Sequence, residues 1–303
     1  MNTKLTEIYE AIRRFPTAES IGLGEPETVS MELFRFVTKH VPVGTDMRIL
    51  DLGCGLGRSS APFVDYLSNG GGHLVGVDVV ERMTAFCSEV IGSRYSNASF
   101  YACSVPDSYL FEQQRNNPTI LPPIEKILAR HEPFDLVMAF SVFTHLLPEE
   151  MDAYFSLFNH ILKPDGRLVL TFLFLDEWTR PKIRNRALPS MISRDTPNPM
   201  PEPGRVCFSS PSNPRAVVAI AIDDVLAMVK AHGFQPEQIH FGSWRAMPSE
   251  TFQDALVLQR EHTIPADFDP KRYLALHEDV ARSGIDPAQH YLIWGKKERR
   301  PYK

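Results

Sequence analysis

The stretch Ile49–Ser60, ILDLGCGLGRSS, joins a short apolar segment to a run of alternating glycines. The apolar segment is typical of a buried strand, and a helix is expected to begin near Arg58. Gly53, Gly55 and Gly57 allow the backbone to come close to a ligand, and the first turn of the following helix offers free N–H groups. We therefore expect a nucleotide-like ligand over these glycines.

Short apolar runs alternate with longer helical patterns from about residue 46 to 176, which is typical of right-handed βαβ units around a parallel sheet. The clearest helix is Pro148–Lys163, where apolar residues recur at three and four. The predicted strands are 48–52, 73–78, 99–103, 134–141 and 167–175.

The pattern breaks at residues 181–214, which contain eight prolines. We predict a long loop here, with neither a helix nor a central strand, because proline lacks an amide hydrogen. The loop leaves the carboxyl end of the fifth strand, where open α/β sheets bind ligands. This loop is either a lid over the active site or a surface loop without a functional role.

Beyond the loop we predict a helix at 222–232 and two strands at 238–245 and 252–259. Six residues join these strands, too few for a parallel crossover, so they form an antiparallel hairpin. The fold class is thus α/β, a seven-stranded Rossmann-like sheet that is mostly parallel with an antiparallel last hairpin. The hairpin places Trp244 and Arg245 at the ligand edge.

These patterns divide the chain into three parts. Residues 1–45 form a helical cap with a helix at 28–40, and residues 46–262 form the main domain. Residues 267–303 form a small helical module, too short for a robust core of its own, so it should dock on the main domain or on a partner.

Composition restricts the environment and the partners. A net charge of −5 gives no general attraction to nucleic acid or anionic lipid, and the basic cluster Lys296–Arg300 is interpreted as a solvated helix end. The four cysteines show no metal-ligand or disulfide spacing. No apolar run reaches membrane-spanning length and no secretory leader is evident, so we expect a cytoplasmic protein.

Two details favour a ligand other than a dinucleotide. A dinucleotide fingerprint needs glycine or alanine where this chain has Arg58 or Ser60. Asp78 ends the second predicted strand, where an acid can reach ribose hydroxyls; its alternative role is to cap the next helix.

These motifs, DLGCGLG with VGVDV, resemble the class I S-adenosylmethionine-dependent methyltransferases, and the likeness covers about residues 20–260. FDLVMAFSVFTHLLPEE and LKPDGRLVLTFLF resemble the family's fourth and fifth strand segments. The resemblance implies S-adenosyl-L-methionine as the cofactor, with the glycines along its methionine and adenosine portions, Asp78 on the ribose and Ser141 beside the sulfonium. Ser104 would lie near adenine, although an Asp is common there in the family. The cofactor-binding residues implied in this way are Asp51, Gly53, Cys54, Gly55, Gly57, Asp78, Val79, Ser104 and Ser141.

The segments SVFTHLLPEE and GSW…FQDALVLQR look most like bacterial methyltransferases associated with glycan modification. Residues 273–302 resemble a module found beside bacterial glycosyltransferases. The resemblance implies O-methylation of a sugar hydroxyl in a glycan or glycoconjugate, with a glycosyltransferase or a second copy of the chain as the module's partner. Alternatives are methylation of another small molecule, a non-catalytic cofactor-binding scaffold and a nicotinamide oxidoreductase.

A hydroxyl acceptor must lose a proton, and a histidine is suited to remove it near neutral pH. His145 lies four residues after the predicted fourth strand and is the candidate catalytic base; alternatively it orders the turn before Pro148. Trp178, Trp244 and Arg245 are candidate substrate-binding residues, or else packing residues of the hairpin and loop. Asp223 and Asp224 are interpreted as partners of a helix start, so no metal is predicted.

Overall fold

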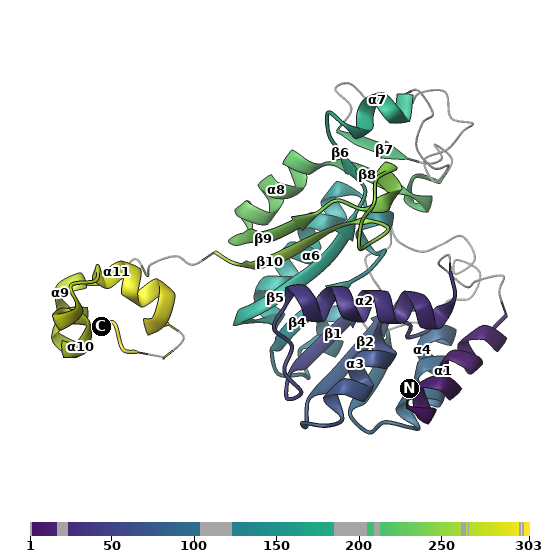
Figure 1. The fold of residues 1–303 in the computed structure, drawn as a ribbon, viewed down its shortest axis with the longest axis horizontal. Helices are drawn as coiled ribbons and strands as arrows, with labels where there is room; N and C mark the ends of the chain where they lie inside the picture. The colour runs from purple at the N-terminus through teal and green to yellow at the C-terminus, as the bar shows by residue number, and fades with distance from the viewer. Residues whose placement is uncertain are drawn as a thin grey trace. The chain divides into compact units, whose positions relative to one another are not determined.

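The computed structural model describes residues 2–16, 24–103, 123–184, 205–208, 213–261, 265, 267–296, 298 and 300–303. The chain divides into two compact units, Met1–Gln259 and Arg260–Lys303 (Figure 1). The α-helices of the first unit are α1 (Thr3–Arg14), α2 (Pro26–His40), α3 (Ser60–Leu67), α4 (Glu81–Cys87), α5 (Ile124–Leu128), α6 (Pro148–Ile161), α7 (Thr179–Arg184) and α8 (Ile222–Ala231).

Seven of the described strands form one sheet in the order β3-β2-β1-β4-β5-β10-β9. The pairs β1–β2, β2–β3, β1–β4 and β4–β5 are parallel, whereas β10 is antiparallel to β5. This arrangement confirms the predicted fold class. The strands are β1 (Arg48–Leu52), β2 (His73–Asp78), β3 (Ala98–Ala102), β4 (Phe134–Ala139), β5 (Leu162–Phe172), β9 (Phe234–His240) and β10 (Asp254–Arg260).

The core consists of two apolar layers, one on each face of this sheet. Side chains alternate along a strand, so Leu50 and Leu52 enter one layer and Ile49 enters the other. Helices α5, α6 and α8 cover the first layer, and α1 to α4 cover the second. Because both faces are covered, the central strands are mostly apolar, and polar residues such as Asp51 and Asp78 lie near their carboxyl ends.

The predicted hairpin is displaced along the chain. Its strands lie at 234–240 and 254–260, so thirteen residues rather than six join them. Ile239 and Phe241 are partly exposed, and Trp244 packs in a short 3-10 turn, Ser243–Arg245. The apolar run that favoured a strand at 238–245 is therefore mostly a connection. The strand that precedes it contains Pro236 and lies at the sheet edge, where proline is tolerated.

Two other boundaries move. The helix predicted for 148–163 ends at Ile161, and β5 begins at Leu162. The strand predicted for 134–141 ends at Ala139, because Ser141 has a φ of +59°, which breaks the extended backbone.

The proline-rich segment 181–214 is not all loop. Helix α7 contains Pro181 in its first turn, where an amide hydrogen would have no helical partner. Strand β7 (Val206–Phe208) is an edge strand of a small sheet with β8 (Val218–Ala221) and β6 (Phe174–Leu175), which was not predicted. Residues 185–204 and 209–212, on which the lid hypothesis depends, lie outside the described residues.

The second unit contains α9 (Pro270–Leu276), α10 (Glu278–Ser283), α11 (Pro287–His290) and a π-helical turn, Tyr291–Gly295. Asp269 and Asp286 cap α9 and α11 through their side chains, and Gly284 ends α10 in the left-handed conformation. Its small core is mostly aromatic and is built on Tyr273, Val280 and Tyr291.

All four cysteines are free and buried, in agreement with the absence of disulfide spacing. Among the described residues, no helix combines the length and apolarity that a membrane crossing requires.

Candidate cofactor and acceptor site

The turn after β1 is held against β2 by its own backbone. Gly53 N and Cys54 N both donate to Val77 O, at 2.8 and 3.1 Å. Gly53, Gly55 and Gly57 have φ angles of +71°, +52° and +79°, a region that residues with a side chain rarely adopt. All three glycines are therefore required by the path of the chain.

The space around the three glycines differs. A Cβ on Gly53 would lie 2.4 Å from Val142 Cγ2, and one on Gly57 would lie 2.4 Å from Ile91 Cδ1. A Cβ on Gly55 would meet nothing within 4 Å. Gly53 and Gly57 thus allow the loop to pack on the protein, whereas Gly55 borders open space that a ligand can use.

Asp78, at the end of β2, links the glycine turn at Gly55 to the backbone of Val80. Its Oδ2 accepts a hydrogen bond from Gly55 N and its Oδ1 accepts one from Val80 N, each at 2.8 Å. Burial raises the pKa of Asp78, while these two N–H donors act in the opposite direction. The residue that caps α4 is Val80, so Asp78 is not the helix cap. Each carboxylate oxygen retains acceptor capacity for a ligand hydroxyl. Val79 is half-buried against the core.

Asp51 lies beneath the loop and is only 1% exposed. Ser59 Oγ and Ser60 Oγ donate to its Oδ2 at 2.7 and 2.5 Å, which ties the end of β1 to the start of α3. Burial raises the pKa of Asp51 to about 6, and the two serine donors partly oppose the shift. Cys54 is also buried; its contact with the Cys87 thiol and its burial raise its pKa well above the ordinary value, so it packs as a neutral thiol.

A polar cluster occupies the carboxyl ends of β4 and β5. Ser141 N donates to Thr171 Oγ1 at 2.8 Å, and Thr171 Oγ1 donates to Gln253 Oε1 at 2.6 Å. The glycine loop adjoins this cluster, because Val142 follows Ser141 and fills the space beside Gly53. Thr171 was not singled out from the sequence, since one threonine in an apolar strand gives no signal. Ser104 lies outside the described residues.

His145 ends a 3-10 turn, Phe143–His145, that follows β4. Its Nδ1 lies 2.9 Å from the carbonyl oxygen of Arg215. A carbonyl can only accept, so Nδ1 carries the hydrogen and Nε2 keeps its lone pair. Arg215 is itself held by Glu150, because its Nη2 donates to Glu150 Oε1 at 3.1 Å. His145 is therefore held in one orientation by the carbonyl oxygen of Arg215. Arg215 is a residue that sequence reasoning missed.

The three predicted substrate-binding residues differ in exposure. Trp178 is 54% exposed, and Lys182 Nζ lies 3.7 Å from the centre of its ring. Trp244 and Arg245 are each 3% exposed. Trp244 Nε1 donates to Asp254 Oδ2 at 2.9 Å, and Arg245 pairs with Asp176. This burial agrees with the packing alternative for Trp244 and Arg245.

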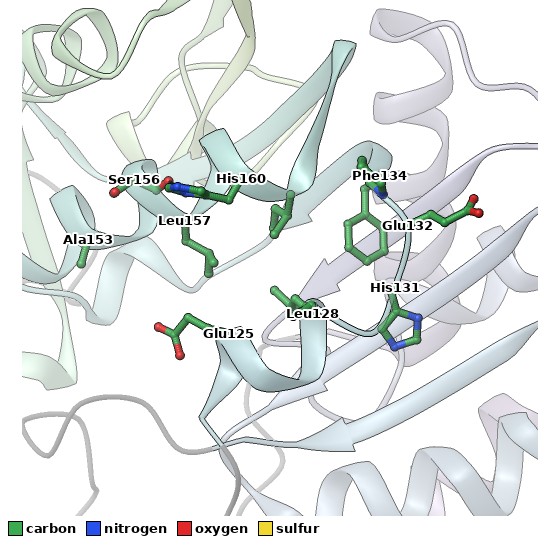
Figure 2. Close-up of a pocket in the computed structure, with 12 residues that line it drawn as sticks. Glu125, Leu128, His131, Glu132, Phe134, Ala153, Ser156, Leu157 and His160 are labelled. Atoms are coloured by element: carbon green, nitrogen blue, oxygen red, sulfur yellow. Dashed lines mark hydrogen bonds between the residues drawn. The ribbon is translucent and has the colours of Figure 1, made fainter.

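Two further features lie away from the glycine turn and the Ser141 cluster. A cavity of about 580 Å³ opens between α5 and α6 and is lined by Leu128, His131, Phe134 and Leu157 among others (Figure 2). Phe134 begins β4, so this cavity lies at the opposite end of that strand from Ser141. Asp223 and Asp224 stand in the first turn of α8, and Asp224 accepts from Arg205 Nε at 2.5 Å.

Comparisons with known proteins match the part of the chain that contains the carboxyl ends of β1, β2 and β4. Residues 50–168 match a family model described as a methyltransferase domain. A solved protein from Pyrococcus horikoshii OT3 has the same fold, with a TM-score of 0.51 and 22% identity over 83% of this chain and 98% of its own.

Two further solved structures are more distant. A magnesium protoporphyrin IX methyltransferase from Synechocystis with bound SAH gives a TM-score of 0.47 and 16% identity over 86% of this chain and 96% of its own. A didemethyltoxoflavin N1-methyltransferase from Burkholderia thailandensis also gives 0.47, with 17% identity over 84% and 85%. The family match at 50–168 covers the glycine turn, Asp78 and Ser141, so this part of the chain matches a methyltransferase domain.

Proposed function

We propose that the protein is an O-methyltransferase that acts on a sugar hydroxyl in a glycan or glycoconjugate, with His145 as the general base. The observation that carries the proposal is the hydrogen bond from His145 Nδ1 to Arg215 O, which leaves Nε2 ready to accept a proton. When bound, S-adenosylmethionine supplies an electrophilic methyl group on its sulfonium sulfur.

The residues of the ligand edge fit this cofactor. Gly55 borders open space, and Asp78 offers a carboxylate at the place where ribose hydroxyls can reach it. The backbone at Gly53 to Gly57 would follow the cofactor, and Ser141 would stand near the transferred group. Asp51 would act indirectly, by holding the start of α3 in place.

The proposed reaction needs alignment of the acceptor and removal of its proton. Methyl transfer is an in-line displacement, so a fixed acceptor and an oriented base supply much of the acceleration. His145 would take the hydroxyl proton at Nε2 as the oxygen attacks. Trp178 is 54% exposed, and a sugar would stack on the ring face opposite Lys182 or in place of Lys182, which supports a saccharide acceptor.

The test compares methyl transfer from labelled S-adenosylmethionine to a panel of saccharides by the intact protein, His145→Ala and His160→Ala. His160 lies on α6 with Nδ1 bonded to Ser156 O within the same helix, so it controls for the loss of a histidine. We expect His145→Ala to lower kcat by about 10²- to 10⁴-fold. SAH affinity should change little.

Other outcomes would redirect the assignment. Turnover on a non-sugar hydroxyl alone would keep the methyltransferase and replace the acceptor class. SAH binding without turnover on any acceptor would favour a scaffold that recruits a partner through residues 267–303. Unchanged turnover in His145→Ala would remove His145 as the base.

A further inference from the structure

We propose that His40, His240 and Glu250 form a binding site for a divalent transition-metal ion of the zinc type. His40 ends α2, His240 ends β9, and Glu250 lies in the connection that leads to β10. A nitrogen of each histidine and a carboxylate oxygen of Glu250 all lie within 4.8 Å of one another. The site is separate from the proposed methyl-transfer chemistry.

The three side chains are already assembled. His40 Nε2 lies 2.8 Å from Glu250 Oε2, and the rings of His40 and His240 have centroids 4.2 Å apart. Zinc bonds of roughly 2.0–2.1 Å in a tetrahedral arrangement place ligand atoms about 3.3 Å apart. Small side-chain rotations would therefore bring the three donors to bonding distance of one ion.

Gln238 orients one of the ligands. Its Oε1 lies 2.9 Å from His240 Nε2, and its Nε2 donates to the backbone oxygen of His40 at 3.3 Å. The amide oxygen can only accept, so His240 Nε2 carries the hydrogen and Nδ1 keeps the lone pair that binds a metal. A metal-binding histidine commonly has its second nitrogen fixed in this way.

The donor set determines the class of ion. Two imidazoles and one carboxylate suit zinc and its neighbours, whereas magnesium and calcium prefer six or more oxygen ligands. Lys39 pairs with Glu250 Oε1, and so leaves Oε2 facing His40. Water would complete a four-coordinate site.

The ion would fix the connection between β9 and β10, residues 241–253, which ends at Gln253 beside Ser141. Glu250 precedes Thr251, whose carbonyl accepts from Ser243 N at 2.9 Å and whose hydroxyl donates to Gln253 O at 2.8 Å. Gln253 in turn accepts from Ser141. Zinc at this place would tie the end of α2 to residues 241–253 and raise the melting temperature.

The test uses the full chain without a histidine tag. ZnCl₂ is titrated in competition with a chromophoric chelator, which gives the affinity and the number of ions bound. The melting temperature is measured at the same zinc concentrations. We expect about one ion per chain, and an affinity at least about tenfold lower in His40→Ala and His240→Ala. His160→Ala, an exposed-helix control, should bind like the parent. The metal-free variants are compared with the parent by circular dichroism, so that loss of folding is recognised.

Three results would overturn the proposal. They are the absence of saturable binding at one ion per chain, equal affinity in the parent and both histidine variants, and binding that is lost equally in His160→Ala. A fourth variant, Gln238→Leu, should also lower the affinity by about tenfold. Unchanged affinity in that variant would overturn the assignment of His240 Nδ1 as the ligand atom.

Discussion

Ser141 Oγ donates a hydrogen bond to Gln253 Oε1 at 3.2 Å, although the two residues are 112 positions apart in the chain. The same oxygen accepts from Thr171 Oγ1 at 2.6 Å. One buried amide thus joins the ends of β4 and β5 to the start of β10. It also keeps Ser141 in its left-handed conformation beside the glycine loop.

Replacing this amide should loosen the link between the ends of β4 and β5 and the start of β10. In Gln253→Leu, the hydroxyls of Ser141 and Thr171 lose an acceptor in a buried place, and we expect the free energy of unfolding to fall by about 1–3 kcal/mol. Urea denaturation measures the change. Gln289→Leu, at an exposed position of the second unit, should change it by less than about 0.5 kcal/mol. Equal effects of the two substitutions would contradict a special role for Gln253.

The central strands and the glycine turn could be predicted from the sequence because their signals are local. Strands predicted at 48–52 and 73–78 coincide with β1 and β2, since both segments are apolar on both faces. The glycine turn was predicted because its positive φ angles demand glycine at every second position. The parallel sheet then places Asp78 beside Gly55.

The rest of the site depends on contacts that no local pattern records. Thr171 and Gln253 are ordinary polar residues until β5 and β10 pair. Strand β9 is mostly polar and contains a proline, so its sequence does not indicate a strand. The strand was predicted at 238–245 instead, where more residues are apolar. His40, His240 and Glu250 lie about 200 positions apart at the extremes, and only the packing of α2 on the sheet edge brings them together.

Adding a methyl group at Gly55 should separate ligand binding from folding. Gly55→Ala meets no protein atom, so its cost to stability is the left-handed backbone, roughly 1 kcal/mol, but the new methyl enters the space proposed for the cofactor. We expect SAH affinity, measured by calorimetry, to fall by at least about tenfold.

Gly71→Ala is the matched control. Gly71 has a φ of +83°, and a Cβ at this position would also meet nothing within 4 Å, but it lies in the turn before β2, at the amino end of that strand and away from the carboxyl ends. The two variants should lose similar stability, and only Gly55→Ala should lose affinity. Equal SAH affinity in both variants would contradict a cofactor role for Gly55.

Asp51 should make stability depend on pH in the acid range. Its pKa of about 6 in the folded protein exceeds the ordinary value near 3.9, so the folded state holds a proton that the unfolded state releases. This group's contribution is therefore lost as pH rises from about 4 to 6, by up to roughly 3 kcal/mol. Asp51→Asn does not titrate, so the unfolding free energy of the parent should fall relative to the variant across that window. A constant difference between them from pH 4 to 7 would show that Asp51 keeps an ordinary pKa.

Arg245 should be essential for stability because it neutralises the buried Asp254 and the half-buried Asp176. Its guanidinium pairs with Asp176, lies 3.7 Å from Asp254 Oδ1 and stacks on the ring of Phe241. Burial raises the pKa of Asp254 to about 6, and the nearby Arg245 opposes the shift. Arg245→Met leaves both carboxylates without this cation, and we expect a loss of about 3–5 kcal/mol at pH 7.5.

Two comparisons test this explanation of the Arg245 effect. Arg14→Ala removes an exposed partner of Glu10 and should cost less than about 1 kcal/mol. In Arg245→Met the pKa of Asp254 should rise further, because the opposing cation is gone. The folded variant then keeps the Asp254 proton at pH 5.5 more fully than the parent does, so the loss measured by urea denaturation should be smaller at pH 5.5 than at pH 7.5. A loss that is the same at both pH values would assign the effect of Arg245 to packing against Phe241 rather than to charge.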